Sequence, residues 1–505
     1  MLSDAEFLSK VKANRVVAVV DSVFADSESP LSIFEKLAQG NEGSFLLESA
    51  AQGVWSRFSF IGVNSRGRLV QEAGQPVTWV SASGANAFPS DLNIELPLTA
   101  LDAVEAIQAA WSSHSLDLEI PLASGLVGSL GWNVIREIER LPDAKAPILD
   151  FPTVSLSMIQ DLVVVDHHSA TILFVANVFV EGQSDSELLA EKKAAQSRIE
   201  ALKNKLAQPH APFIASVDFE IEPSVESNQT KEAFLNAVEI AKEHVRQGDV
   251  FQVVLSQNFA TELNAEPLTL YRLLRALNPS PYMYLLNGAD SLGKFAIVGS
   301  SPESLVTVTG ADVVTHPIAG SRPRGKDWES DQRHESDLQG DRKEIAEHLM
   351  LVDLARNDLL RVCEPDSVAV TEFMQVHRFS HIMHLVSTVE GKLREGQTPI
   401  DVFRATFPAG TLSGAPKPRA LEIITQLEPT DRGLYGGVCG YFDFAGNSDL
   451  AIAIRTAFVR DGRALVQAGA GIVLDSDPVS EYEETRSKAR AVLRAIAAAN
   501  KAESL

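Results

Sequence analysis

The sequence predicts an α+β fold in which strands dominate the first half and helices alternate with strands in the second. From residue 16 to residue 152, runs of β-branched and aromatic residues alternate with Gly, Pro, Asn and Asp, a pattern typical of strands joined by turns. Beyond residue 228, several segments carry apolar residues at helical spacing, and apolar runs lie between them. A chain of 505 residues is also long enough for two or three large structural units.

The first half ends in a helix and a polar connection. Ser184 is expected to cap a helix that ends before Pro209, because apolar residues recur behind it and leave a charged outer face. Residues 208–229 are polar and contain prolines, which is typical of a linker. We therefore divide the chain into an amino-terminal region with its linker, residues 1–227, and a second domain, residues 228–505.

The second domain shows helices and strands in alternation. Its first helix is expected just before Gly248, where four apolar residues recur at helical spacing. Further helices are expected from about Asp341 and over residues 478–500. The expected strands cover residues 250–259, 295–299, 305–308, 438–444 and 450–459.

The composition argues against several classes of function. Forty-four Lys and Arg against 67 Asp and Glu give a formal net charge of −23, so the chain repels nucleic-acid phosphates and anionic lipids. No segment approaches the ~20 apolar residues of a membrane-spanning helix. We therefore expect a cytoplasmic protein with no nucleic-acid and no membrane partner. Cys363 and Cys439 lack the spacing of a zinc site, and neither stands in the sequence context of a glutaminase nucleophile.

Two pairs of glutamates at helical spacing are candidate metal ligands. Glu344 with Glu347, and Glu481 with Glu484, are each three residues apart, so each pair lies on one face of a helix. Two such faces could hold Mg²⁺, which prefers oxygen ligands. Lys488 extends the second face with a positive charge. The alternative is an ordinary solvated surface, which is the common outcome for such pairs in an acidic protein.

Other segments carry groups suited to an anionic ligand. Gly469 and Gly471 would let backbone N–H groups approach a carboxylate, although a structural turn is equally compatible. Residues 406–417 combine hydroxyls and glycines ahead of a helix start, which favours anions only weakly. Arg455 lies within an apolar run and should have an anionic partner, either a carboxylate of the fold or a ligand. His384 is compatible with a core position or with acid–base chemistry.

Taken in order, these segments resemble the chorismate-utilising enzymes, and most closely the large subunit (component I) family of anthranilate synthase. Together the matching segments cover most of residues 228–500, and shorter matches occur at residues 46–49, 56–62 and 125–128. The matching segments are residues 317–325, 344–358, 383–387, 407–417, 435–437, 467–472 and 480–485. The resemblance implies a large mixed α/β sandwich of antiparallel sheets flanked by helices.

The resemblance also implies a role for each candidate residue. The four glutamates would border a Mg²⁺ that bridges to the ring carboxylate of chorismate. Glu303 would protonate the departing ring hydroxyl, although it could instead cap a turn after Pro302. His384 and Thr411 would complete the catalytic set. The implied substrate-binding residues are Gln252, Tyr435, Arg455, Gly469, Ala470, Gly471 and Lys488.

Two positions separate the implied reaction from those of relatives. Isochorismate and salicylate synthases carry a water-activating lysine where this chain has Gln252, and free ammonia needs no such base. Aminodeoxychorismate synthases commonly carry a nucleophilic lysine where this chain has Ala319. We therefore expect chorismate and ammonia to give anthranilate and pyruvate, the first step of tryptophan biosynthesis. Alternatives are an aminodeoxyisochorismate or aminodeoxychorismate synthase, and a catalytically silent binding module.

The resemblance further implies feedback inhibition and a partner. Residues 1–227 would form a regulatory, tryptophan-binding region, and residues 228–505 the chorismate-binding catalytic domain. Because the chain has no recognisable glutaminase nucleophile, a glutamine amidotransferase subunit (component II) would supply ammonia from glutamine. The residues implied in tryptophan binding are Glu48, Ser49, Pro279, Tyr282 and Met283.

Overall fold

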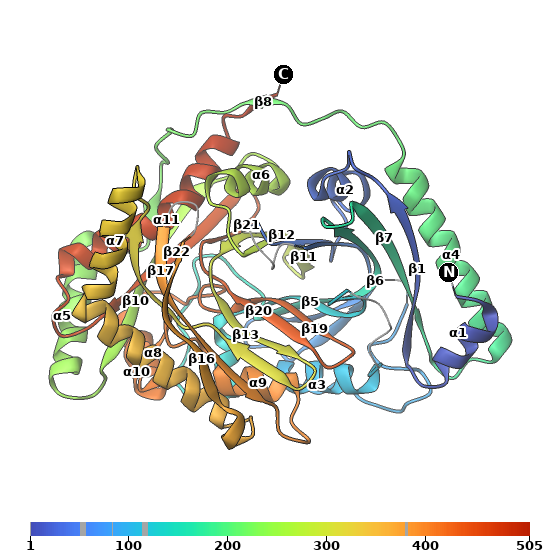
Figure 1. The fold of residues 1–505 in the computed structure, drawn as a ribbon, viewed down its shortest axis with the longest axis horizontal. Helices are drawn as coiled ribbons and strands as arrows, with labels where there is room; N and C mark the ends of the chain where they lie inside the picture. The colour runs from blue at the N-terminus through green and yellow to red at the C-terminus, as the bar shows by residue number, and fades with distance from the viewer. Residues whose placement is uncertain (1, 51–56, 83, 114–119, 379–381, 505) are drawn as a thin grey trace.

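The computed structural model describes residues 2–50, 57–82, 84–113, 120–378 and 382–504. Most of its strands form one 21-stranded network, two short strands pair separately, and every pairing between named strands in the described ranges is antiparallel. Helices lie outside the strands on opposite sides of the molecule (Figure 1). The predicted α+β fold, with antiparallel sheets flanked by helices, is confirmed.

The amino-terminal region is built mainly from strands. β1 (Val16–Phe24) pairs with β7 (Thr171–Phe179), which also pairs with β6 (Val154–Asp166). Outside them lies α4 (Asp185–Leu206), which Ser184 caps as predicted (Figure 1). The other elements are α1 (Asp4–Val11), α2 (Pro30–Leu37), β2 (Phe45–Glu48), β3 (Phe58–Gln71), β4 (Thr78–Ser81), α3 (Ala100–Ala110), β5 (Gly125–Leu130) and the short helix η2 (Trp132–Glu137).

A long connection then crosses from α4 to the other side of the molecule (Figure 1). It carries two short strands, β8 (Ala215–Ser216) and β9 (Glu226–Ser227). Strands of the two predicted domains are hydrogen-bonded to each other: β2 pairs with β11 (Tyr282–Asp290), and β5 pairs with β19 (Val438–Asp443). The division at residues 227 and 228 stays a prediction.

The second region contains the predicted helices and most of the predicted strands. α5 (Lys231–Arg246) precedes Gly248, whose φ of 79° suits glycine, and Asp341 caps α8 (Arg342–Leu360). The last long helix is α11 (Pro478–Ala499). The remaining elements are β10 (Gln252–Glu262), α6 (Pro267–Leu277), β12 (Gly293–Ser301), β13 (Ser304–Thr309), β14 (Asp312–Thr315), β15 (Ile318–Pro323), α7 (Trp328–Gly340), η3 (Pro365–Ser367), β16 (Ala369–Arg378), β17 (Ile382–Lys392), α9 (Pro399–Thr406), β18 (Gly414–Ala415), α10 (Lys417–Leu427), β22 (Arg463–Ile472) and β23 (Glu503–Ser504).

One predicted strand is wrong in a way that matters for the site. The apolar segment 450–459 is two strands, β20 (Ser448–Ile452) and β21 (Thr456–Arg460), because they pair with different neighbours. β20 pairs with β13 and β19, whereas β21 pairs with β12 and β22. Arg455 lies at the break with a φ of 52°, a conformation that side-chain-bearing residues rarely adopt.

A buried core supports the segments that carry the candidate residues. Tyr435 and Leu412 belong to one large apolar cluster, together with Val253 of β10 and Ala470 and Ile472 of β22. The backbone near the glycine segment is therefore fixed by packing on both strands. Among the described helices, none combines the length and apolar character needed to cross a bilayer.

Candidate active site

Glu303 and Thr411 form a partly buried, hydrogen-bonded pair. Glu303 directly precedes β13, and Thr411 lies on the loop after α9. The Thr411 hydroxyl donates a hydrogen bond of 2.9 Å to Glu303 Oε1. Burial raises the pKa of Glu303 to about 7, and the bond from Thr411 and the charges of Lys488 and Arg455 only partly oppose this. A carboxyl group with this pKa can act as a general acid near neutral pH.

A small cavity lies behind this pair. Its lining includes Glu303, Thr411, His316 and Asp358. Asp358 on α8 accepts a hydrogen bond of 2.6 Å from Lys417 Nζ. This ion pair joins the helix that carries two of the predicted metal ligands to the start of α10.

The glycine segment of β22 accommodates two predicted substrate-binding side chains. A Cβ atom on Gly469 would lie 2.7 Å from the Tyr435 hydroxyl, and one on Gly471 would lie 2.4 Å from Gln252 Nε2. Both glycines are therefore needed for Tyr435 and Gln252 to pack against the strand. Ala470 between them is fully buried. In the described chain, β21 pairs with one edge of β22 only at residues 463–466. Along residues 467–472 of the described chain, this edge faces the site and not β21.

Two cationic side chains border this segment. Lys488 Nζ donates to the Gly469 carbonyl at 3.0 Å and pairs with Glu484 at 2.7 Å. Arg455 Nη1 donates to the backbone carbonyl of Lys488. Burial lowers the pKa of Arg455, whereas Tyr435 and the nearby acidic groups act in the opposite direction. The charges of Arg455 and Lys488 provide local attraction for an anion in a chain of net charge −23.

His384 lies on β17 opposite Ser321 of β15. Its Nδ1 lies 3.0 Å from the Gly320 carbonyl, which can only accept, so Nδ1 carries the proton of a neutral ring. Burial lowers the pKa of His384, which favours this neutral form at neutral pH. The ring is thereby oriented by the same strand that contains Ala319.

The four predicted metal ligands come from α8 and α11. Burial raises the pKa of Glu347, and so do the negative charges of the neighbouring Glu344 and of Glu484 on the other helix. Burial, followed by Glu484, raises the pKa of Glu481. In the described residues, no three acidic, histidine or cysteine side chains lie close enough to hold an ion by themselves. This donor set suits a hard cation that keeps several waters and binds a substrate carboxylate, not a closed protein cage.

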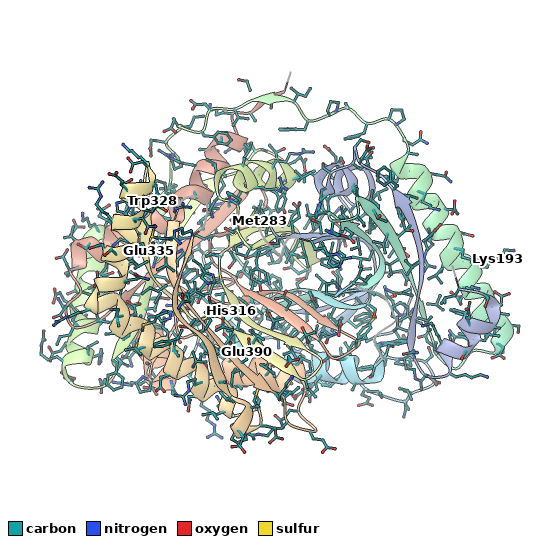
Figure 2. The ribbon with its side chains drawn as sticks, viewed as in Figure 1. Lys193, Met283, His316, Trp328, Glu335 and Glu390 are labelled. Atoms are coloured by element: carbon teal, nitrogen blue, oxygen red, sulfur yellow. The ribbon has the colours of Figure 1, made fainter. Side chains whose placement is uncertain are left out.

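The residues predicted to bind tryptophan lie near the junction of β2 and β11. Glu48 is buried, accepts a hydrogen bond of 2.6 Å from the Tyr271 hydroxyl, and pairs with Met283 across the strands. Figure 2 shows Met283 in the middle of the molecule. Tyr282 is adjacent to Met283 on β11, so its side chain points to the opposite face and donates to Asp449. The structure therefore places Glu48 and Met283 together and turns Tyr282 away.

The other two members of this set lie on connecting segments. Ser49 follows β2, and among the described residues its buried hydroxyl has no hydrogen-bond partner. Pro279 lies between α6 and β11, and the next residue, Ser280, accepts a hydrogen bond from the Ala50 amide at 3.0 Å. The two connections thus lie side by side.

Sequence reasoning missed a buried ion pair beneath the site. Arg432 and Glu428 are 3% and 5% exposed and pair at 2.6 Å. Their spacing of four residues was visible, but the same spacing is common on solvated surfaces. Their position shortly before the matching segment 435–437 was the only signal that could have marked them.

Comparison with known proteins places this geometry in a family. A family model described as chorismate binding enzyme matches residues 42–494. The chain belongs to the chorismate-binding enzyme family. The match begins before Glu48 and ends after Lys488, so it includes every candidate site residue.

Similarity to individual members of the chorismate-binding enzyme family extends over nearly the whole chain. It is 48% identical to anthranilate synthase component 1 of Arthrobacter globiformis, over 97% of this chain and 92% of that protein. It is 47% identical to that of Mycobacterium tuberculosis, over 98% and 96%. The crystal structure of anthranilate synthase component I from Streptococcus pneumoniae matches with a TM-score of 0.73 and 33% identity, covering 93% of this chain and 99% of that one. The predicted family resemblance is confirmed.

Proposed function

We propose that this chain is the chorismate-converting component of an anthranilate synthase, which combines chorismate with ammonia and releases anthranilate and pyruvate. The observation that carries the proposal is similarity over nearly the full length, at 40–48% identity, to proteins named anthranilate synthase component 1. The site supports it, because Glu303, Arg455 and Lys488 provide an acid and two cations for a dianionic substrate.

The substrate would bind between the cations and the glycine segment. Arg455, Lys488 and the backbone N–H groups of residues 469–471 would hold the carboxylates of chorismate. Tyr435 would close the site beside Gly469, and Gln252 beside Gly471. His384, fixed by its bond to Gly320, would lie beside the ring.

Glu303 would supply the proton that the leaving hydroxyl needs. Ammonia forms a C–N bond at the carbon ortho to the ring carboxylate, and the ring hydroxyl departs as water with the proton of Glu303. Thr411 orients this carboxyl group. The nitrogen added from ammonia carries one proton in excess, and its release balances the proton that Glu303 gives up. Loss of the ring proton and of the enolpyruvyl group as pyruvate then gives the aromatic ring.

Two residues favour direct attack by ammonia. Ala319 is 8% exposed, lies on β15 and cannot form a covalent adduct with the ring. Gln252 is buried and carries no basic group that could activate water. The chain would therefore use ammonia as its nucleophile.

Mg²⁺ is the proposed cofactor, held between α8 and α11 by Glu344, Glu347, Glu481 and Glu484. When bound, Mg²⁺ would neutralise the ring carboxylate and act as a template. The raised pKa values of the partly buried Glu347 and the buried Glu481 agree with a site in which carboxylates lack a full set of partners.

The proposed partner is a glutamine amidotransferase subunit, the second component that the names of the relatives imply. The relatives' designation as component 1 fits a chain that carries no recognisable glutaminase nucleophile, since Cys363 and Cys439 are both buried. The assembly would act in the cytoplasm, where tryptophan is made.

Product analysis tests the proposed reaction. Purified chain incubated with chorismate, Mg²⁺ and ammonium should release anthranilate and pyruvate in equal amounts, measured by chromatography and a coupled pyruvate assay. Accumulation of aminodeoxyisochorismate without pyruvate would instead assign the alternative reaction, and aminodeoxychorismate would contradict the argument from Ala319.

Tryptophan is the proposed feedback inhibitor, and we propose Glu48, one of the residues implied in its binding, as the partner of its ammonium group. Tryptophan should raise the thermal midpoint of the wild-type chain and lower its rate. Glu48→Gln should weaken tryptophan binding about 10- to 100-fold, because a charged hydrogen bond is lost. The matched control is Glu42→Gln, since Glu42 is more exposed and pairs with Arg68 instead. Tryptophan that leaves both the rate and the thermal midpoint of the wild-type chain unchanged would contradict this prediction.

A further inference from the structure

The buried arginine Arg432 binds several separate parts of the candidate site at once. It lies on the connection between α10 and β19, and its side chain is 1% exposed. Nε and Nη2 donate to the two oxygens of Glu428 at 2.8 and 2.6 Å. Nη1 donates to the Leu412 carbonyl at 2.7 Å, and Nη2 also donates to the Val254 carbonyl at 2.9 Å. The guanidinium group thus uses its planar fork on three different segments.

The two bonds to backbone carbonyls end next to residues with a proposed role. Leu412 follows Thr411, which donates to Glu303. Val254 on β10 is the register partner of Gly471. The guanidinium also lies 5.5 Å from the centre of the Tyr435 ring, and the Tyr435 amide donates to the Arg432 carbonyl at 3.0 Å.

The carboxylate of Glu428 anchors the arginine to the same strand. Glu428 Oε1 accepts hydrogen bonds from the amide and the hydroxyl of Ser256, at 2.8 and 2.7 Å. Ser256 is the register partner of Gly469, and its hydroxyl accepts a hydrogen bond of 2.7 Å from the side-chain amide of Gln467. The ion pair is therefore connected to both glycines of the segment through β10.

A buried ion pair is weak evidence for stability, because two apolar side chains of similar volume often stabilise a core equally well. An apolar pair could not fix the carbonyls of Leu412 and Val254, however. The number and direction of the bonds point to the geometry of the site as their function.

We propose that Arg432, held by Glu428, is a positioning residue that sets Thr411, Tyr435 and the Gly469–Gly471 segment in register with one another for the reaction on chorismate. This inference rests on the proposed function. The hydrogen bonds of the Arg432 side chain go to Glu428 and to two backbone carbonyls, so it acts through these carbonyls and through the Tyr435 ring that it contacts.

Arg432→Lys in the full chain tests the inference. Lysine keeps the charge but cannot form the forked contacts with Glu428, Leu412 and Val254 together. We expect kcat to fall about 10- to 100-fold, because small misplacements of reacting groups are costly, with a smaller change in the KM for chorismate. The matched control is Arg460→Lys. Arg460 is also buried, pairs with Asp290, and contacts Phe295 and Phe458, but it lies at the far end of β21. Its kcat should stay within a few-fold of wild type.

The pH profile separates positioning from loss of stability. The bond from Thr411 lowers the pKa of Glu303, so loosening Thr411 should raise this pKa. The alkaline limb of the rate, where the acid loses its proton, should therefore move to higher pH in Arg432→Lys. Thr411→Val should move it in the same direction, and the double variant should move it no further than Thr411→Val alone. The charged or titratable groups that face Glu303 remain unchanged; they are Arg455, Lys488, Tyr435, His316 and Asp358.

Each outcome decides the inference. An unchanged kcat and pH limb in folded Arg432→Lys, or a shift that simply adds to that of Thr411→Val, would overturn it. If Arg432→Lys does not fold, as judged by circular dichroism, Ser256→Ala decides instead. That variant removes the hydroxyl that holds Glu428 on β10. It should move the alkaline limb of the rate to higher pH, by less than Thr411→Val does. An alkaline limb that does not move would overturn the inference. A wild-type chain that does not convert chorismate would contradict the proposed function itself.

Discussion

Replacing Glu303 by Gln is expected to lower kcat by about 10²- to 10⁴-fold, because the amide cannot give a proton to the leaving hydroxyl. The KM for chorismate should change little, since Arg455 and Lys488 are unaltered. In the wild-type chain, the rate corrected for the concentration of free ammonia should fall as pH rises through about 7, the pKa to which burial raises Glu303. This alkaline limb should be absent from the residual activity of the variant.

Stability measurements provide the control for this substitution. The pKa of Glu303 is raised in the folded chain from 4.5 to about 7, so the folded state holds this proton more tightly than the unfolded state. The contribution of Glu303 to stability therefore decreases as pH rises from about 4.5 to about 7 and stays unfavourable above that. Glu303→Gln removes this effect, and its thermal midpoint at about pH 8 should equal or exceed that of wild type. A large loss of stability in the variant, or full activity, would contradict the assignment.

Glu347→Gln and Glu481→Gln should each abolish most activity at low Mg²⁺. Removal of one carboxylate should weaken the apparent affinity for Mg²⁺ by about 100-fold or more, because even indirect supports of metal ligands contribute about 10- to 100-fold. High Mg²⁺ should restore part of the rate, which a steady-state titration of Mg²⁺ would measure. Chelation of the metal should stop the wild-type reaction.

The same helix supplies a matched control. Glu483 lies between Glu481 and Glu484, yet its side chain is 58% exposed and pairs with Lys231 at 3.3 Å. Glu483→Gln should therefore leave the dependence on Mg²⁺ unchanged. If Glu483→Gln weakened the apparent affinity for Mg²⁺ as much as Glu481→Gln, the loss would reflect acidic charge in general. That result would contradict the proposed metal site.

Local patterns predicted the elements that carry the site, but not how these elements meet. The caps at Ser184 and Asp341 and the helical spacing of the glutamate pairs are properties of neighbouring residues, and the structure places α4, α8 and α11 where they were expected. The bond between Thr411 and Glu303 joins residues 108 positions apart, and no periodicity contains it.

Two features of the site depend on tertiary context alone. The run 450–459 is apolar throughout, so its division at Arg455 follows from a change of strand partners that the pattern does not record. Arg432 and Glu428 have the spacing of a surface pair and become a buried one only because β10 and the Leu412 carbonyl close over them. For such residues, sequence resemblance identified the neighbourhood, and the structure identified the contacts.

The most direct measurement of the central claim is anthranilate fluorescence from the purified chain alone, given chorismate, Mg²⁺ and either ammonium or glutamine. We expect a signal that requires both Mg²⁺ and ammonium, and no signal with glutamine, because the chain is proposed to depend on a partner for ammonia. A chain that forms anthranilate from glutamine by itself, or that leaves chorismate unchanged with ammonium and Mg²⁺, would contradict this account.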